Sequence, residues 1–175
     1  MEKQSQRSWL QDVSIAGTKT RYGGTLIKVI NSNLLLERVK VLSSKMFNKH
    51  GGIHLAFSHV DMHDCRFDMG QPPEWYKKPV VPEIPGDLQG GFLYVGSNSS
   101  VTSRNNVYSN GRAVVGGCVA FQGESRGTFT NDTFQHCSAV QGGAIYGQDF
   151  ADITVASSTF KNNTAFSGQG ENLFL

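Results

Sequence analysis

Pairs of adjacent glycines recur along this chain at a spacing that constrains its fold more than any other feature. The pairs begin at Gly23, Gly51, Gly90, Gly116 and Gly142, and a degenerate sixth copy begins at Gly170. The step between successive copies is nearly constant, except for a longer step from Gly51 to Gly90. A period of about 20 to 50 residues is typical of repeat proteins, in which each repeat is one structural unit that stacks on the next. The pattern therefore indicates stacked coils rather than a single central core.

A second landmark recurs in register with the glycine pairs. A short apolar run follows each pair, as in residues 92–95 and 144–146. An apolar anchor stands at one constant distance after the first glycine in three of the coils, at Val41, Phe134 and Phe160. The third coil offers Val107 or Tyr108 at this place, and the second coil offers Phe67 two places early. Two independent landmarks in register are a strong repeat signal.

The segments between these landmarks are short and β-rich, and Gly, Asn, Ser and Asp separate them. We predict an all-β fold, a right-handed parallel β-helix (β-solenoid) of about five to six coils, stacked about 4.8 Å apart. Its coils start near residues 23, 51, 90, 116, 142 and 170, after a lead-in or cap over residues 1–22. Stacked asparagines such as Asn110 and Asn163 are expected to form hydrogen-bond ladders.

The apolar runs after the glycine pairs are nearly continuous rather than alternating. Continuous apolar sequence is typical of a strand that is covered on both faces. One face would be the solenoid core, and a partner or a further segment would cover the other. An exposed, moderately apolar strand is the open alternative.

The last complete coil resembles a known surface-protein repeat. Gly142-Gly143-Ala144-Ile145 matches the GGAI motif, and Phe160-Lys161-Asn162-Asn163 the FxxN motif, of the polymorphic outer membrane protein repeats of chlamydiae. The preceding coil keeps Gly116-Gly117 and Phe134, but Cys137 replaces the asparagine. The resemblance covers roughly residues 23–175. It implies a right-handed, pectin-lyase-like β-helix, an adhesin-like role and surface exposure.

All five prolines lie in an insertion in the second coil, between residues 70 and 89. Proline cannot donate to a sheet ladder, so this Pro-rich segment is expected to leave the solenoid as a stiff excursion. Insertions in repeat proteins often mark the binding face. We therefore expect Trp75, Tyr76, Lys77 and Lys78 to contact a protein or glycan partner. Aromatic side chains that fold back on the coil are the alternative.

His59, Asp61 and His63 alternate with Val60 and Met62. In a strand, this pattern places the three polar side chains on one face, about 7 Å apart in succession. That spacing is wide for one metal ion. We therefore expect a solvated outer strand face, with no metal and no other cofactor.

Parallel β-helices also include polysaccharide lyases and hydrolases, and glycosidases need two nearby carboxyl groups. The close carboxylate pairs within the coils are Asp61 with Asp64 and Asp149 with Asp152. Neither pair lies beside an Arg or Lys that would act as a lyase base, and carboxylates on loops are usually turn formers. We expect no enzymatic activity, and a carbohydrate-active enzyme is the alternative.

Charge and hydrophobicity argue against a nucleic-acid partner and against a membrane-spanning segment. The formal net charge is +2 and no basic run stands out, so we expect no nucleic-acid partner. Every apolar stretch is shorter than the length that a membrane-spanning helix needs, so we expect no membrane span. The start of the chain, from Met1 to Leu10, contains no apolar signal core.

Cysteines and glycosylation signals bear on the compartment. Cys65, Cys118 and Cys137 are an odd number that cannot all pair within the chain, so they fit a disulfide framework poorly. The possible N-glycosylation acceptors, relevant only on a secretory route, are Asn98, Asn131 and Asn162.

The expected function is that of a structural or adhesive module of a larger surface or extracellular protein. Residue 175 stops just inside a new apolar run, so we expect this edge to pair with further repeats or with a neighbour. A structural subunit of a large assembly is the second alternative.

Overall fold

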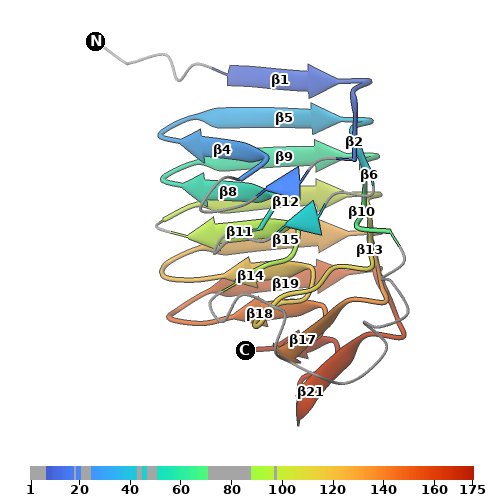
Figure 1. Cartoon of the computed structure of the whole chain (residues 1–175). Coiled ribbons are helices and arrows are strands. Elements are labelled where there is room, and N and C mark those ends of the chain that lie inside the picture. Colours follow the sequence, from blue (N-terminus) through green and yellow to red (C-terminus); the bar gives the residue numbers. More distant parts are fainter. Residues whose placement is uncertain are drawn as a thin grey trace.

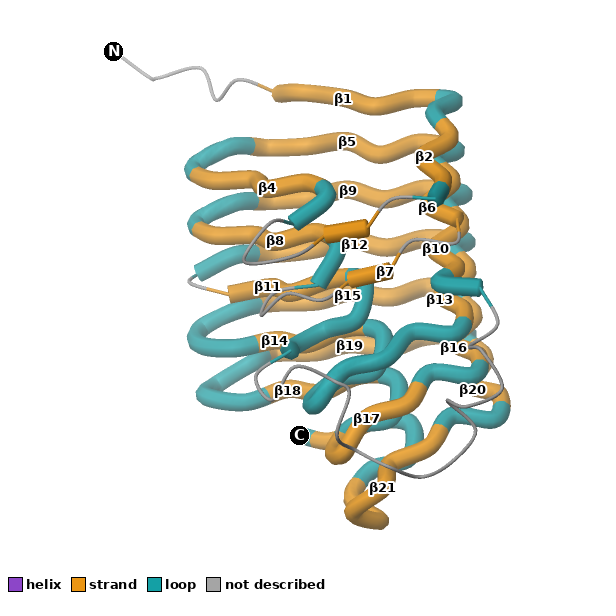
Figure 2. The backbone as a smooth tube through the Cα atoms, viewed as in Figure 1, coloured by secondary structure: helices purple, strands orange, loops and turns teal. Residues whose placement is uncertain are grey.

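The computed structural model describes residues 7–17, 19–20, 25–42, 45–46, 51–70, 88–96 and 98–175. These residues form strands and turns without a helix, so this part of the chain holds no helix that is long and apolar enough to cross a membrane. The strands stack in parallel into a solenoid (Figure 1), and each coil passes through the same sheets in the same order (Figure 2). The predicted all-β parallel β-helix is confirmed.

Three six-stranded parallel sheets form the walls of the solenoid. Sheet I contains β1 (Arg7–Gln11), β5 (Asn33–Glu37), β9 (His59–His63), β12 (Ser100–Arg104), β15 (Arg126–Thr130) and β19 (Asp152–Ala156). Sheet II contains β2 (Ser14–Ala16), β6 (Lys40–Leu42), β10 (Arg66–Asp68), β13 (Val107–Ser109), β16 (Thr133–Gln135) and β20 (Thr159–Lys161). Sheet III contains β4 (Ile27–Ile30), β8 (Ile53–Ala56), β11 (Leu93–Gly96), β14 (Val119–Phe121), β18 (Ile145–Gly147) and β22 (Leu173–Phe174). Two shorter pairings join β3 (Lys19–Thr20) to β7 (Lys45–Met46) and β17 (Ser138–Gln141) to β21 (Thr164–Gln169).

The solenoid begins before the first glycine pair. β1 pairs with β5, β2 with β6 and β3 with β7, all in parallel. The described residues from 7 to 17 and 19 to 20 thus contribute strands to the sheets, where the sequence predicts a lead-in or cap over residues 1–22. The pair at Gly23 and Gly24 lies outside the described residues.

The glycine pairs are required by the backbone of each corner. The first glycine of a pair has a positive φ, 61° at both Gly116 and Gly142, a conformation that glycine adopts without steric cost. The second glycine lies beneath the next coil. A Cβ on Gly117 would come within 2.1 Å of the carbonyl oxygen of Gly143, so a side chain there would collide with the neighbouring coil.

The aromatic anchors of the last four coils form a continuous column inside sheet II, and Val41 precedes them in the same register. Phe67 stacks on Tyr108 with ring centroids 5.2 Å apart, and Tyr108 stacks on Phe134 at 4.8 Å. Phe160 continues the column at 5.1 Å from Phe134. The strand register therefore selects Tyr108 rather than Val107 as the anchor of its coil.

The second coil has its anchor two places early because two of its turns are each shorter by one position. Ile53 pairs with Leu93, yet Ile53 is the second residue after Gly51 and Leu93 is the third after Gly90. Two residues separate β8 from β9, whereas three separate β11 from β12. Phe67 is therefore a regular member of the repeat.

The expectation that the three cysteines fit a disulfide framework poorly is wrong for two of them. Cys118 and Cys137 form a disulfide, with Cα atoms 5.6 Å apart, and Cys65 is a buried free thiol. The sequence separation of the two paired residues is 19. The path of one coil brings them together, which is why counting and spacing alone did not reveal the pair.

A polar ladder lies at the corner between sheets I and II. The backbone N–H of Cys65 donates to Asn106 Oδ1 (2.6 Å), and the N–H of Asn106 donates to Asp132 Oδ1 (2.7 Å). The N–H of Asp132 then donates to Ser158 Oγ (3.1 Å). Each side chain thus satisfies a buried backbone donor of the preceding coil.

The expected ladder between Asn110 and Asn163 does not form, because the two residues occupy different positions in their coils. Asn110 Nδ2 donates to Asp68 Oδ1 (2.8 Å). Asn163 Oδ1 instead accepts from the backbone N–H of Cys137 (2.9 Å). Asn163 still binds between coils, but with a cysteine as its neighbour.

The outer face of sheet III is covered over part of its length. Tyr94 on β11 and Ala120 on β14 point outward, yet they are only 8% and 2% exposed. Tyr94 donates to Gln122 Oε1 (2.7 Å) and packs edge-on against His54. The prediction of strands covered on both faces is confirmed for β11 and β14. For β8 and β18 the alternative of a partly exposed strand holds instead, because their outward residues are half-buried.

Candidate functional site

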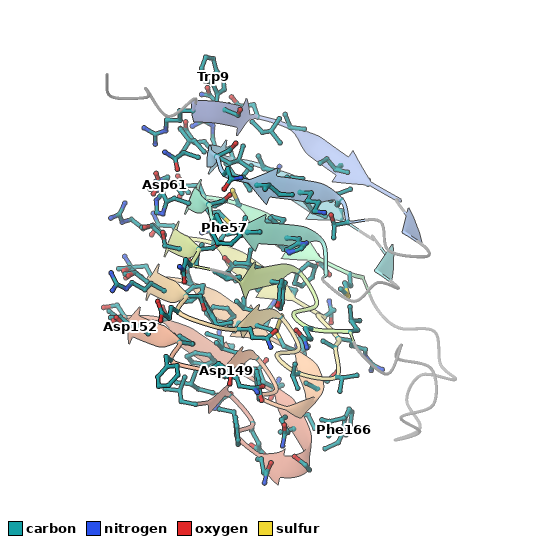
Figure 3. All side chains as sticks on the ribbon, turned by 90° about the vertical axis from the view of Figure 1, so that its left-hand side faces the viewer. Trp9, Phe57, Asp61, Asp149, Asp152 and Phe166 are labelled. Atoms are coloured by element: carbon teal, nitrogen blue, oxygen red, sulfur yellow. A yellow bond between two sulfur atoms is a disulfide. The ribbon has the colours of Figure 1, made fainter. Side chains whose placement is uncertain are left out.

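The outer face of sheet I carries polar side chains in regular rows. Alternation along β9 buries Val60 and Met62 and turns His59, Asp61 and His63 outward, as predicted. Because the strands pair in register, one row contains Arg7, Asn33, His59, Ser100, Arg126 and Asp152. The next row contains Trp9, Leu35, Asp61, Thr102, Thr128 and Thr154. Trp9, Asp61 and Asp152 are labelled along this side of the molecule in Figure 3.

A chain of hydrogen bonds crosses the face from one coil to another. Arg7 Nη2 donates to Asp61 Oδ2 (3.0 Å), and Asp61 Oδ1 lies 3.0 Å from His59 Nε2. His59 Nδ1 lies 2.7 Å from Ser100 Oγ. The chain therefore connects a cation, a carboxylate, an imidazole and a hydroxyl, contributed by β1, β9 and β12.

The carboxylate determines how the His59 ring carries its proton. An ionised Asp61 only accepts hydrogen bonds, so His59 Nε2 must be the donor. In the neutral imidazole, Nδ1 is then left with a lone pair that accepts the Ser100 hydroxyl proton. The geometry thus prepares His59 to receive a proton from Ser100. Both side chains of the ion pair stay partly accessible, at 35% for His59 and 23% for Asp61.

Arg126 adds a positive charge beside Ser100. The two residues are partners in the ladder between β12 and β15, so their side chains leave the same face one coil apart. In the part of the chain that the structure describes, Arg126 forms no ion pair and no side-chain hydrogen bond. Its guanidinium is exposed and remains available to an anion or a polarised carbonyl.

The other candidates from the sequence are dispersed over the molecule. Asp64 and Asp149 have positive φ values of 54° and 57° and occupy turns, whereas Asp61 is paired with Arg7 and His59. Among the described residues, no three His, Cys, Asp or Glu side chains are placed to hold a metal ion. Within the described ranges, His59 and Asp61 are therefore the only two of these His and Asp candidates in direct contact.

The insertion and the glycosylation signals remain predictions. Trp75, Tyr76, Lys77 and Lys78 lie outside the described residues. The three sequon asparagines are exposed at turns, with φ values of 53°, 56° and 51° at Asn98, Asn131 and Asn162. Asparagine tolerates this left-handed conformation well, which explains its presence at these corners without any modification.

Asp132 is a buried titratable group, but it serves the corner ladder rather than the surface. Its side chain is inaccessible, and burial raises its pKa from 3.8 to about 6 although the Asn106 N–H opposes the shift. Oδ2 has no hydrogen-bond partner among the described residues. Burial of this carboxylate lowers the stability of the fold. The group lies inside the coil rather than on the outer face of sheet I.

Sequence reasoning singled out His59 and Asp61 but missed Arg7, Ser100 and Arg126. The available signal was the repeat itself, since equivalent positions in neighbouring coils lie side by side. The distance along the sequence from the first glycine of the coil differs, however. His59 lies two positions closer to Gly51 than Ser100 lies to Gly90. The two shortened turns therefore hide the pairing unless Phe67 is used to correct the register.

The comparisons with known proteins agree with this architecture. No curated protein and no solved structure matches the chain. The family model of the right-handed β-helix region matches residues 5–173, which include every strand of the three sheets up to Leu173. This match supports the predicted hand of the solenoid. The chain therefore belongs to the right-handed β-helix family.

Proposed function

We propose that the chain is a structural and adhesive module of a larger surface or extracellular protein, and that the outer face of sheet I binds a glycan. The observation that carries the proposal is the pair of in-register rows on this face. Hydroxyl, imidazole, amide and guanidinium groups recur there about every 4.8 Å. Such an array offers donors and acceptors to successive sugar hydroxyls.

Trp9 completes the chemistry that a sugar requires. It lies in the same row as Asp61 and Thr102, on β1, and is 70% exposed. An exposed indole offers a flat apolar surface and one N–H donor, which suits stacking on a sugar ring. An extended glycan that runs across the coils would meet the indole first and the threonine hydroxyls beyond it.

Two further features support an extracellular setting. Disulfides persist mainly in oxidising compartments, and Cys118 and Cys137 form one here. The resemblance of residues 142–163 to the chlamydial GGAI and FxxN repeats points to surface-exposed adhesins as well. Both arguments favour attachment at a cell surface as the role of this solenoid.

The proposal can be tested by binding the whole chain to an array of neutral and acidic oligosaccharides. We expect the wild-type chain to bind a subset of the glycans. Its affinity for these glycans should fall at least tenfold in Trp9→Ala and in the double variant Thr102→Ala/Thr128→Ala. Phe166→Ala is the matched control, because Phe166 is an exposed aromatic on β21, away from this face. Equal binding by all variants, or binding to no glycan, would refute the proposal.

A further inference from the structure

Ser100 ends a hydrogen-bonded series with the group types and order of the Asp–His–Ser relay of acyl-transfer enzymes, but the two imidazole nitrogens are exchanged, since Ser100 faces Nδ1 and Asp61 faces Nε2. Its Oγ lies 2.7 Å from His59 Nδ1, and His59 Nε2 lies 3.0 Å from Asp61 Oδ1. We propose that Ser100 is a nucleophile toward carboxylic esters, with His59 as its general base and Asp61 as a positioning residue. This reactivity goes beyond glycan binding, does not depend on it, and departs from the sequence-based expectation that the chain has no enzymatic activity.

The relay is assembled by the coil stacking rather than by a local motif. Ser100 and His59 are partners in the ladder between β12 and β9, so the two side chains leave the sheet next to each other. Asp61 stands two residues after His59 and projects from the same face. Arg7 binds the second oxygen of Asp61 and restrains the carboxylate from rotating away from the imidazole.

Arg126 provides the charge that an ester carbonyl needs when it is attacked. It flanks Ser100 on the side opposite His59, one coil further along. A positive group beside the developing oxyanion stabilises the tetrahedral intermediate. The face is open to solvent, so this stabilisation is weaker than in a closed site. We therefore expect turnover of small, activated esters and only weak substrate binding.

The reaction needs only Ser100, His59 and water. Ser100 Oγ forms a bond to the ester carbonyl carbon while its proton moves to His59 Nδ1. The bond to the alcohol oxygen then breaks, and the alcohol leaves with that proton. Water attacks the acyl–Ser100 ester, gives a proton to His59, and releases the carboxylic acid as Ser100 regains its proton.

The first test uses an alkyl fluorophosphonate probe and p-nitrophenyl acetate on the full chain. We expect the probe to label Ser100, identified by peptide mass mapping, and the chain to hydrolyse the ester. Ser100→Ala should lose both signals. His59→Ala should slow the labelling by about 100-fold, the lower end of what a general base usually contributes. Thr159→Ala, an exposed hydroxyl on sheet II, should change neither.

Two results would overturn the assignment. One is absence of the label from Ser100 in a chain whose β-sheet circular dichroism is intact, and the other is equal labelling of wild type and His59→Ala. The same spectrum on each variant distinguishes a lost relay from a lost fold. Labelling requires no glycan, so its failure leaves the glycan proposal standing.

A second test isolates the role of Asp61. Nitrogen-15 NMR of the imidazole should find the proton of neutral His59 on Nε2 in the wild type. In Asp61→Asn the side-chain amide can donate to Nε2, which moves the proton to Nδ1 and removes the acceptor of the Ser100 hydroxyl. Labelling should then slow at least tenfold at an unchanged thermal midpoint. An unchanged tautomer with unchanged labelling would remove Asp61 from the relay.

Discussion

Cys118 and Cys137 are joined by a disulfide that crosses the interior of one coil, from the corner after a glycine pair to the corner after β16. In the coil before, Phe92 occupies the position of Cys118 and packs over Gly111, where a Cβ would lie 3.0 Å from the ring. The same interior space is thus filled by an aromatic ring in one coil and by a disulfide in the next.

Loss of the disulfide should destabilise the fold without changing it. The bond closes a segment with a sequence separation of 19, for which the entropic model gives about 3 kcal/mol. We expect the free energy of unfolding of Cys118→Ala/Cys137→Ala to be lower by that amount, so the double variant should unfold at a lower urea concentration. Added reductant should shift the unfolding midpoint of wild type but not of the double variant. Cys65→Ala, which removes the buried free thiol, should leave the sensitivity to reductant intact.

Asp132→Asn should stabilise the protein, and the gain should depend on pH. The folded-state pKa of Asp132 is raised from 3.8 to about 6, so the folded chain binds this proton more tightly than the unfolded chain. Wild type therefore loses stability from this group as pH rises from about 4 to about 6. The asparagine keeps an oxygen for the Asn106 N–H and has no charge. We expect it to add on the order of 1–3 kcal/mol at pH 7.

The measurement is urea unfolding of both proteins between pH 4 and pH 7.5. The difference in unfolding free energy should grow over the first two pH units and then level off. Phe150→Ala, a change at an exposed turn that removes no titratable group, should show no such growth. A difference that is constant across the range would mean that Asp132 is not a buried, neutralised carboxylate.

The aromatic column should carry much of the stability of the middle coils. Phe134 is inaccessible and stacks between Tyr108 and Phe160. Phe134→Ala is expected to cost about 3–5 kcal/mol, because it leaves a cavity and breaks the column. Phe150→Ala is the matched control, since Phe150 is 91% exposed, and it should change stability by less than about 0.5 kcal/mol. Equal costs in thermal or urea unfolding would show that the column is not the core.

The parts of the fold that could be predicted are those that every coil must repeat. Gly117 and Gly143 lie beneath the backbone of the next coil, so the steric requirement recurs and leaves a periodic trace in the sequence. Phe134 and Phe160 recur for the same reason, because each ring stacks on its equivalent one coil away.

The features that escaped prediction each depend on a single coil. The partner of Cys118 depends on the path between two corners, which the other coils do not share. Ser100 meets His59 only after two small differences in turn length are taken into account. The burial of Tyr94 depends on what lies over sheet III, a tertiary property that the apolar run suggested for every coil but that holds for only two strands among those described.

The Pro-rich insertion offers the last prediction, and it competes with the outer face of sheet I as the attachment site. Its five prolines restrict the chain before binding, so less conformational entropy is lost when a partner docks. Trp75→Ala/Tyr76→Ala should weaken attachment to a protein or glycan partner, with the thermal midpoint changed by only a few degrees, about the effect of 1 kcal/mol or less. Lys77→Ala/Lys78→Ala should weaken attachment most at low salt, where charge attraction is least screened.

A fall of the thermal midpoint by more than about 10 °C in Trp75→Ala/Tyr76→Ala would instead identify Trp75 and Tyr76 as packed against the second coil. Attachment would then belong to the face that carries Trp9 and Thr102.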